Sequence, residues 1–171
     1  TTGGSFVLVV TSYEDKGEDN TIGVAFPFKD DFSWVTEYVD LARAAGVAIN
    51  DSVGEVTDSA DGAANVYTTL PNKGIDFLGA LRGRGYTDLN AFQKTIYLQD
   101  GYLKYGKTDC QSGLILPLMK IDGEQDIAVQ FQWCSHITGS GNVDKTELVV
   151  AIEGPGTVVT TAGTTSAKIS D

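Results

Sequence analysis

The sequence predicts a mainly β fold, a jelly-roll-like β-sandwich with one or two short helices within residues 34–92. Three observations support it: many short β-prone runs, a hairpin signature, and a strict apolar alternation that ends at Trp133. In that alternation Ile127, Val129, Phe131 and Trp133 share one face of a strand. We therefore expect these side chains to lie inside two stacked sheets.

The first elements follow from local composition. Residues 5–12 are rich in β-branched residues and predict a strand, and residues 21–26 predict a second one. A helical stripe follows, with Asp31 or Ser33 as its cap and Gly46 as its end. The stripe consists of Trp34, Tyr38, Leu41 and Ala45.

The middle of the chain combines a loop and a second helix. Residues 50–74 are polar and contain glycine, so we expect a long ordered loop there. Residues 75–81 predict a short helix that begins close to Asp76.

The second half is predicted to be β throughout. Two β-prone runs, 95–99 and 102–105, flank Asp100 and Gly101, and Asp-Gly between such runs predicts a hairpin with a type I′ turn. Further strands are expected at 113–118, 127–134, 147–152, 157–161 and 165–169.

The domain organisation is expected to be simple. Residues 1–25 are interpreted as an N-terminal strand or linker, and residues 26–171 as the sandwich. The strand-like piece just before the end of the chain suggests that the sandwich is incomplete at its C-terminus, because open edges are normally covered. The chain begins at Thr1, which suggests a processed chain or an excised fragment. No apolar run approaches the roughly 20 residues that a membrane-spanning helix needs.

The charge limits the partners. With 12 basic and 23 acidic residues, the formal net charge is -11. Such a surface repels phosphate backbones, so nucleic acid is not an expected partner. A neutral ligand or a carboxylate-bound cation fits this charge, and so does a surface that is acidic only for solubility.

Cys110 and Cys134 are the only cysteines in the sequence. Their spacing matches no zinc motif. They form a disulfide if two strands bring them within about 7 Å. The alternative is two buried thiols that pack as small apolar groups. Both interpretations stay open at this point.

Six short segments occur in an order that resembles surface lipoprotein domains of gut Bacteroidetes. They are residues 30–34, 65–68, 85–90, 96–99, 103–107 and 139–142. The resemblance covers residues 26–155. It implies a galactose-binding-like jelly roll, an extracytoplasmic location at the cell surface or in the periplasm, a role in glycan handling, and neighbouring immunoglobulin-like repeats.

Catalytic signatures are weak. A Ser–His–Asp triad would have to use His136, the single histidine, and the sequence around Ser140 does not form a nucleophile elbow. The many carboxylates stand in no distinctive setting, so a carbohydrate-active hydrolase is only the third hypothesis. Non-catalytic binding of a polysaccharide or oligosaccharide is the first, and a structural or adhesion module that contacts other proteins is the second.

Sugar binding needs flat aromatic faces and side chains that hydrogen-bond to hydroxyl groups. Tyr86, in a glycine-rich stretch, and Tyr102, after the hairpin turn, are the predicted aromatic platforms, whereas Trp34 and Trp133 are assigned to the core. The predicted hydroxyl partners are Gln130, Gln132, Asn142 and Asp144. No cofactor is expected, except for a structural calcium ion that Asp58 and Asp61 would bind next to the turn at Gly62.

Overall fold

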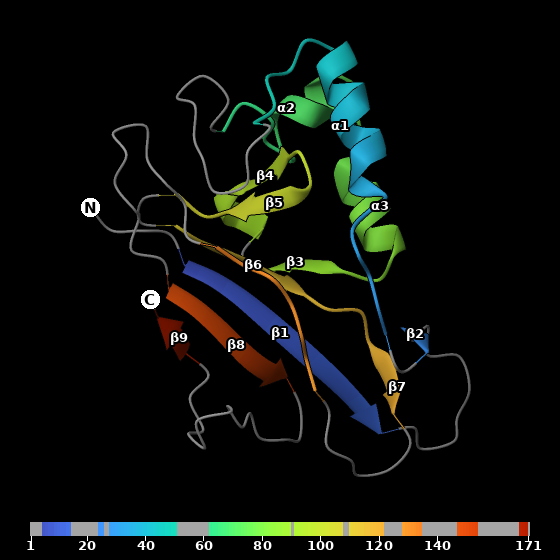
Figure 1. The fold of residues 1–171 in the computed structure, drawn as a ribbon, viewed down its shortest axis with the longest axis vertical. Helices are drawn as coiled ribbons and strands as arrows, with labels where there is room; N and C mark the ends of the chain where they lie inside the picture. The colour runs from blue at the N-terminus through green and yellow to red at the C-terminus, as the bar shows by residue number, and fades with distance from the viewer. Residues whose placement is uncertain are drawn as a thin grey trace.

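The structure is a computed structural model in which strands and short helices form a partly β fold (Figure 1). It describes residues 5–14, 24–25, 28–50, 62–89, 91–107, 110–121, 128–134, 147–153 and 168–170. Within these ranges a mixed sheet occupies one end of the molecule, and the helices gather beyond it (Figure 1).

Strand β1 (Ser5–Glu14) lies in the middle of this sheet. On one side it pairs in parallel with β8 (Glu147–Glu153), in register from Ser5 opposite Glu147 to Thr11 opposite Glu153. The sequence had placed residues 1–25 apart from the sandwich. In the structure β1 belongs to the same sheet as strands from the C-terminal part of the chain.

Two strands share the other side of β1. β6 (Gln111–Ile115) pairs in parallel with its first half, and β7 (Met119–Ile121) pairs in parallel with its last three residues. Pro117 lies in the gap between β6 and β7. Proline has no N–H to donate, and the strand predicted at 113–118 ends at Ile115, before Pro117.

The remaining strands extend the sheet. β2 (Val24–Ala25) pairs in parallel with β7, whereas β3 (Thr87–Leu89) and β9 (Lys168–Ser170) pair antiparallel with β6 and β8. A jelly roll pairs its strands antiparallel. The described strands instead place parallel neighbours on both sides of β1, so this part of the fold prediction is wrong.

Helix α1 (Val35–Ala44) forms where the apolar stripe predicted it and is followed by Gly46 at φ 76°. The stripe itself is shifted. Val35, Val39 and Ala42 form the buried face, while Leu41 is 46% exposed. Neither predicted cap bonds the helix by its side chain: the N-cap is Trp34, without a side-chain hydrogen bond.

The predicted loop at 50–74 is wrong for its second half. Residues 62–72 include helix α2 (Thr69–Asn72), and Ala64, Val66 and Leu70 are fully buried. The sequence did not predict this burial, because the three apolar residues stand singly among polar ones and show no sustained helical or strand periodicity.

Helix α3 (Phe77–Gly83) confirms the predicted short helix. The described part of residues 34–92 contains three short helices rather than one or two. The Asp76 side chain caps α3 and accepts a hydrogen bond from Gly79 N at 2.8 Å. A 3₁₀ turn, η1 (Ala91–Gln93), follows β3.

The predicted hairpin is confirmed as β4 (Ile96–Gln99) and β5 (Tyr102–Tyr105). Its turn is not type I′. Gly101 has a φ of 78°, but Asp100 does not have a positive φ. Asp100 is held from outside the hairpin, because its N–H donates to Asn50 O at 3.1 Å and its carboxylate accepts from Arg43 at 2.9 Å.

The main apolar core lies between the helices and one face of the β4–β5 hairpin. Val39, Leu70 and Phe77 meet Ile96 and Leu98 there, and all five are fully buried. The sequence predicted the core around Trp133. That prediction is wrong, because the main core is formed by the helices and the hairpin. In the described parts, no helix has the length and apolarity to cross a membrane.

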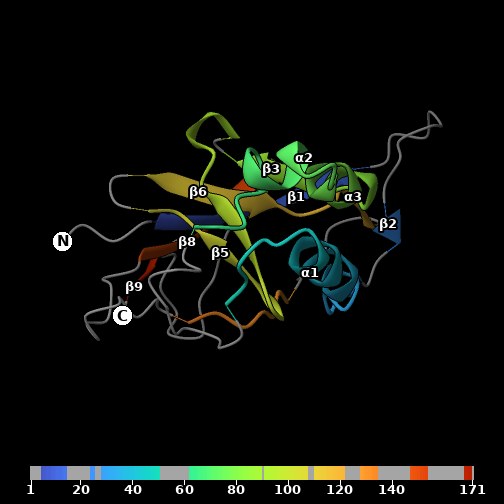
Figure 2. The ribbon, with the colours of Figure 1, turned by 90° about the horizontal axis from the view of Figure 1, so that it is seen from above.

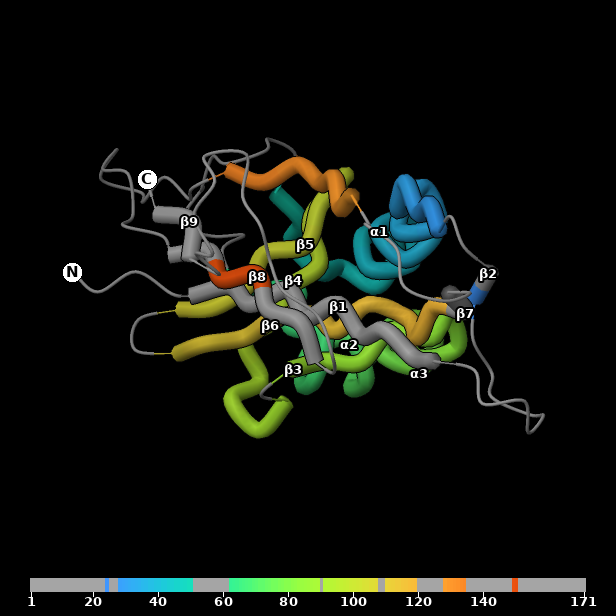
Figure 3. The backbone as a smooth tube through the Cα atoms, turned by 90° about the horizontal axis from the view of Figure 1, so that it is seen from below, coloured from blue at the N-terminus to red at the C-terminus, as the bar shows by residue number. Residues whose placement is uncertain are grey.

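The predicted central strand at 127–134 is a further correction. Residues 128–134 form no ladder, and Val129 and Phe131 are 40% and 36% exposed. The segment lies across one side of the sheet, the side on which α1 also lies (Figures 2 and 3). Without a paired strand here, the inference of two stacked sheets loses its basis.

Candidate functional site

Tyr86 is not available as a sugar platform. Its side chain is 2% exposed, and its ring lies against Phe28 and Phe32 with centroids 6.0 and 5.6 Å apart. Its hydroxyl donates to Asp30 Oδ2 at 2.8 Å. Burial, and secondarily this hydrogen bond to Asp30, raise the pKa of the phenol. Tyr86 is a core residue, and its predicted role is wrong.

Asp30 provides the hydrogen-bond acceptor that the buried Tyr86 hydroxyl needs. The same carboxylate accepts from Phe32 N at 2.8 Å and from Trp34 Nε1 at 3.2 Å. Trp34 in turn stacks on Phe77 at 5.4 Å, and the Arg84 guanidinium lies 4.1 Å above its ring. This cluster joins the segment before α1 to α3, and it confirms the assignment of Trp34 to packing.

A second carboxylate is also occupied by structural contacts. Asp88, 8% exposed, accepts from Tyr67 Oη at 2.9 Å and from Arg82 Nη2 at 3.0 Å. Burial and then the hydrogen bond to Asp88 raise the pKa of Tyr67. Arg82 and Tyr67 thus join α3 and the 62–72 segment to β3. The sequence contained no signal for the bond between Tyr67 and Asp88, which are 21 residues apart in the chain.

Three of the predicted ligand residues belong to elements on the same side of the sheet (Figures 2 and 3). Gln130 and Gln132 are exposed on residues 128–134, a segment we call the strip. Tyr102, on β5, is partly buried; burial raises its pKa to about 12, and the nearby Cys134 at the end of the strip adds to this shift. Figures 2 and 3 both show the strip on the side of the sheet where β5 lies.

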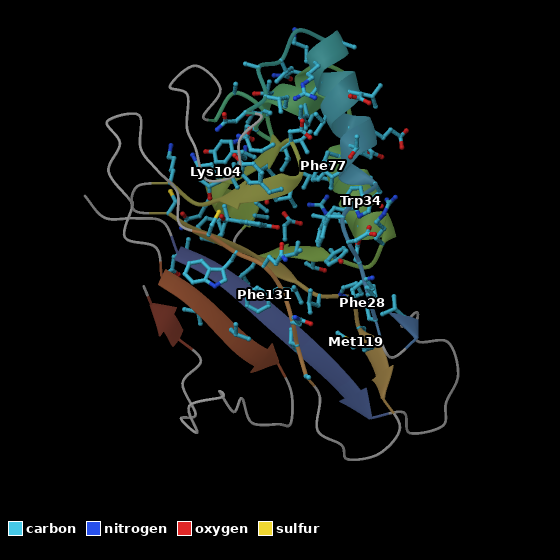
Figure 4. All side chains as sticks on the ribbon, viewed as in Figure 1. Phe28, Trp34, Phe77, Lys104, Met119 and Phe131 are labelled. Atoms are coloured by element: carbon cyan, nitrogen blue, oxygen red, sulfur yellow. The ribbon has the colours of Figure 1, made fainter. Side chains whose placement is uncertain are left out.

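The strip also presents apolar side chains that the sequence assigned to the core. The Phe131 ring lies well away from Trp34 and Phe77 (Figure 4). It is 36% exposed, and Trp133 is partly buried. The alternation predicted a buried aromatic face here, but Val129 and Phe131 are exposed.

The other predicted ligands, Asn142, Asp144, Asp58 and Asp61, lie outside the described residues, as does His136. Within the described residues there is no group of three or more histidine, cysteine or acidic side chains that could hold a metal ion. The calcium site and the hydroxyl-binding role of Asn142 and Asp144 stay predictions.

The strip and Tyr102 carry side chains that suit one kind of ligand. They offer partly exposed aromatic rings and two exposed primary amides, which suit a flat neutral ligand more than an ion. No family model matches this chain, and neither curated proteins nor solved structures match it.

Proposed function

We propose that this chain is a non-catalytic carbohydrate-binding domain of an extracytoplasmic, cell-surface protein, and that the strip and Tyr102 form its glycan surface. The exposed ring of Phe131 carries the proposal, and the exposed Gln130 and Gln132 are its neighbours along the strip. Aromatic faces pack on the C–H patches of a pyranose, and amides exchange hydrogen bonds with its hydroxyl groups.

Two further features support this function. The net charge of -11 favours a neutral ligand over a polyanion. The resemblance to Bacteroidetes surface lipoproteins points to glycans of the kind that such cells encounter.

The experiment measures binding to an array of neutral plant and microbial polysaccharides, followed by calorimetry on any that bind. We expect Phe131→Ala to weaken binding about tenfold, since one aromatic contact contributes roughly 0.5–1.5 kcal/mol beyond its buried area. Gln132→Ala should weaken it several-fold.

Phe92→Ala is the matched control. Phe92 is a phenylalanine that is 78% exposed on η1, away from the strip, so its loss should leave glycan binding unchanged. An array without any binding, or equal losses for Phe92→Ala and Phe131→Ala, would refute the proposal.

A contact module for other proteins is the second candidate. The exposure of Phe92 and of Leu41, at 78% and 46%, favours it. In that case the chain should self-associate or capture neighbouring domains of its own protein, and Phe92→Ala, not Phe131→Ala, should abolish the association in sedimentation experiments.

A further inference from the structure

The strip has the sequence of a strand but no strand partner among the described residues. Its apolar and amide side chains alternate, and such a run with valine, phenylalanine and tryptophan favours a β-strand. In the described part of the chain, no ladder and no backbone hydrogen bond joins the strip to another segment. Backbone N–H and C=O groups need partners, and in an exposed segment another strand can replace water in that role.

The strip is also accessible to a second molecule. All of its residues are exposed except Trp133, which is partly buried. Figures 2 and 3 show no described element on the outer side of the strip. A strand from outside the chain can therefore reach it without displacing any described element.

The distribution of charge points to a second copy of the chain as the partner. No Asp, Glu, Lys or Arg occurs between Asp126 and Asp144, although the net charge of the chain is -11. Two copies repel each other where their acidic surfaces face one another. At the strip they meet without placing like charges opposite each other, a placement that destabilises paired strands.

An antiparallel pair of strips is matched at each of these positions. With Phe131 on the two-fold axis, Gln130 lies opposite Gln132 of the other copy, and Val129 lies opposite Trp133. Apolar side chains then meet apolar ones and amides meet amides, and such cross-strand pairs stabilise a sheet. Both copies use the same surface, as a two-fold dimer requires.

We propose that two copies of this chain associate through antiparallel pairing of their strips, which become strands only in the pair. A stable complex has about 20–30 residues on each side, far more than the strip provides, so the dimer forms at high protein concentration. The inference does not rest on glycan binding, because the pairing uses the backbone of the strip and needs no ligand.

The first test is sedimentation equilibrium of the full chain from about 10 µM to 1 mM, the range expected for so small a contact. Gln130→Lys with Gln132→Lys places like charges opposite each other and should weaken association about tenfold, although it makes the chain less acidic. Gln130→Lys with Gln132→Glu places opposite charges there, and this variant should associate at least as tightly as the unchanged chain. Phe92→Lys, a change on η1 away from the strip, is the control and should leave association unaltered.

The second test fixes the register by cross-linking. Residues directly opposite in an antiparallel pair have Cα atoms about 4.5–5.5 Å apart, within reach of a disulfide. In a Cys110→Ser background, Ala128→Cys places a thiol opposite Cys134 of the other copy. A mild thiol oxidant should then give a covalent dimer. Without Ala128→Cys, the two Cys134 thiols of a dimer lie about 20 Å apart and should link at least about tenfold more slowly.

Four results would overturn the proposal. They are a chain that stays monomeric up to about 1 mM, equal association of the two double variants, loss of association in Phe92→Lys, and cross-linking that Ala128→Cys does not accelerate. None of these measurements includes a glycan, so their failure is separate from any failure of glycan binding.

Discussion

Removing one hydroxyl tests whether Tyr86 is a structural residue. In Tyr86→Phe the ring keeps its contacts with Phe28 and Phe32, but the 2.8 Å hydrogen bond to Asp30 is lost. Hydrogen bonds to charged groups contribute about 1.5–3 kcal/mol. Asp30 keeps its other donors, Phe32 N and Trp34 Nε1, so we expect the low end of this range.

The expected loss is therefore about 1.5 kcal/mol in the free energy of unfolding, which corresponds to a fall of about 3–6 °C in Tm for a chain of this size. Urea unfolding followed by tryptophan fluorescence measures it directly, because Trp34 donates to the same carboxylate. Tyr38→Phe is the control. Tyr38 is partly buried beside Trp34, and no hydrogen bond of its hydroxyl is seen among the described residues, so the loss should stay below about 0.5 kcal/mol.

A double-mutant cycle separates the hydrogen bond from other effects. Combining Tyr86→Phe with Asp30→Ala should give a coupling energy of about 1 kcal/mol, because each change removes the same bond. If Tyr86→Phe costs no more than Tyr38→Phe, or if the coupling is near zero, the reasoning that places Tyr86 in the core is refuted. Glycan affinity of the folded Tyr86→Phe variant should be unchanged.

Two further predictions concern backbone and pH. Gly85→Ala should destabilise the chain more than Gly46→Ala. Both glycines have a positive φ, which costs a residue with a side chain about 1–2 kcal/mol. Only at Gly85 would the new Cβ also lie 3.0 Å from Pro117 Cβ. Equal losses in urea unfolding would contradict this. Stability should also fall above about pH 10, since five tyrosines have a raised pKa in the folded chain and lose their protons more readily when unfolded. Each phenol adds at most about one proton to the pH dependence of the free energy of unfolding. Urea midpoints measured from about pH 8 to 11 test this, and an unchanged midpoint would contradict the burial of these phenols. They are Tyr67, Tyr86, Tyr97, Tyr102 and Tyr105.

Several elements could be predicted because their signals are local. Asp76 before an apolar run marks the start of α3, and Gly46 marks the end of α1. Asp100-Gly101 between two β-prone runs marks the hairpin. In each case the residues that decide the conformation lie within one or two turns of the chain, so their order in the sequence is sufficient.

The candidate site shows where the same approach fails. Gln130 and Gln132 are exposed, as the sequence led us to expect. The aromatic side was assigned to a core, because alternation indicates which residues share a face but not whether another sheet covers it. Tyr86 was expected in solvent because it stands among glycines, yet Asp30, 56 residues earlier, accepts its hydrogen bond in the interior.

By itself, then, the sequence determined the acidic surface, the partly β character, the short helices and the hairpin, all of which depend on composition or on neighbours along the chain. Only the tertiary structure decided that β1 lies between parallel strands and that the core surrounds α1 and the hairpin. The reason is physical: strand partners and burial arise from contacts between residues distant in sequence, and a single segment presents the same pattern whichever partner it meets.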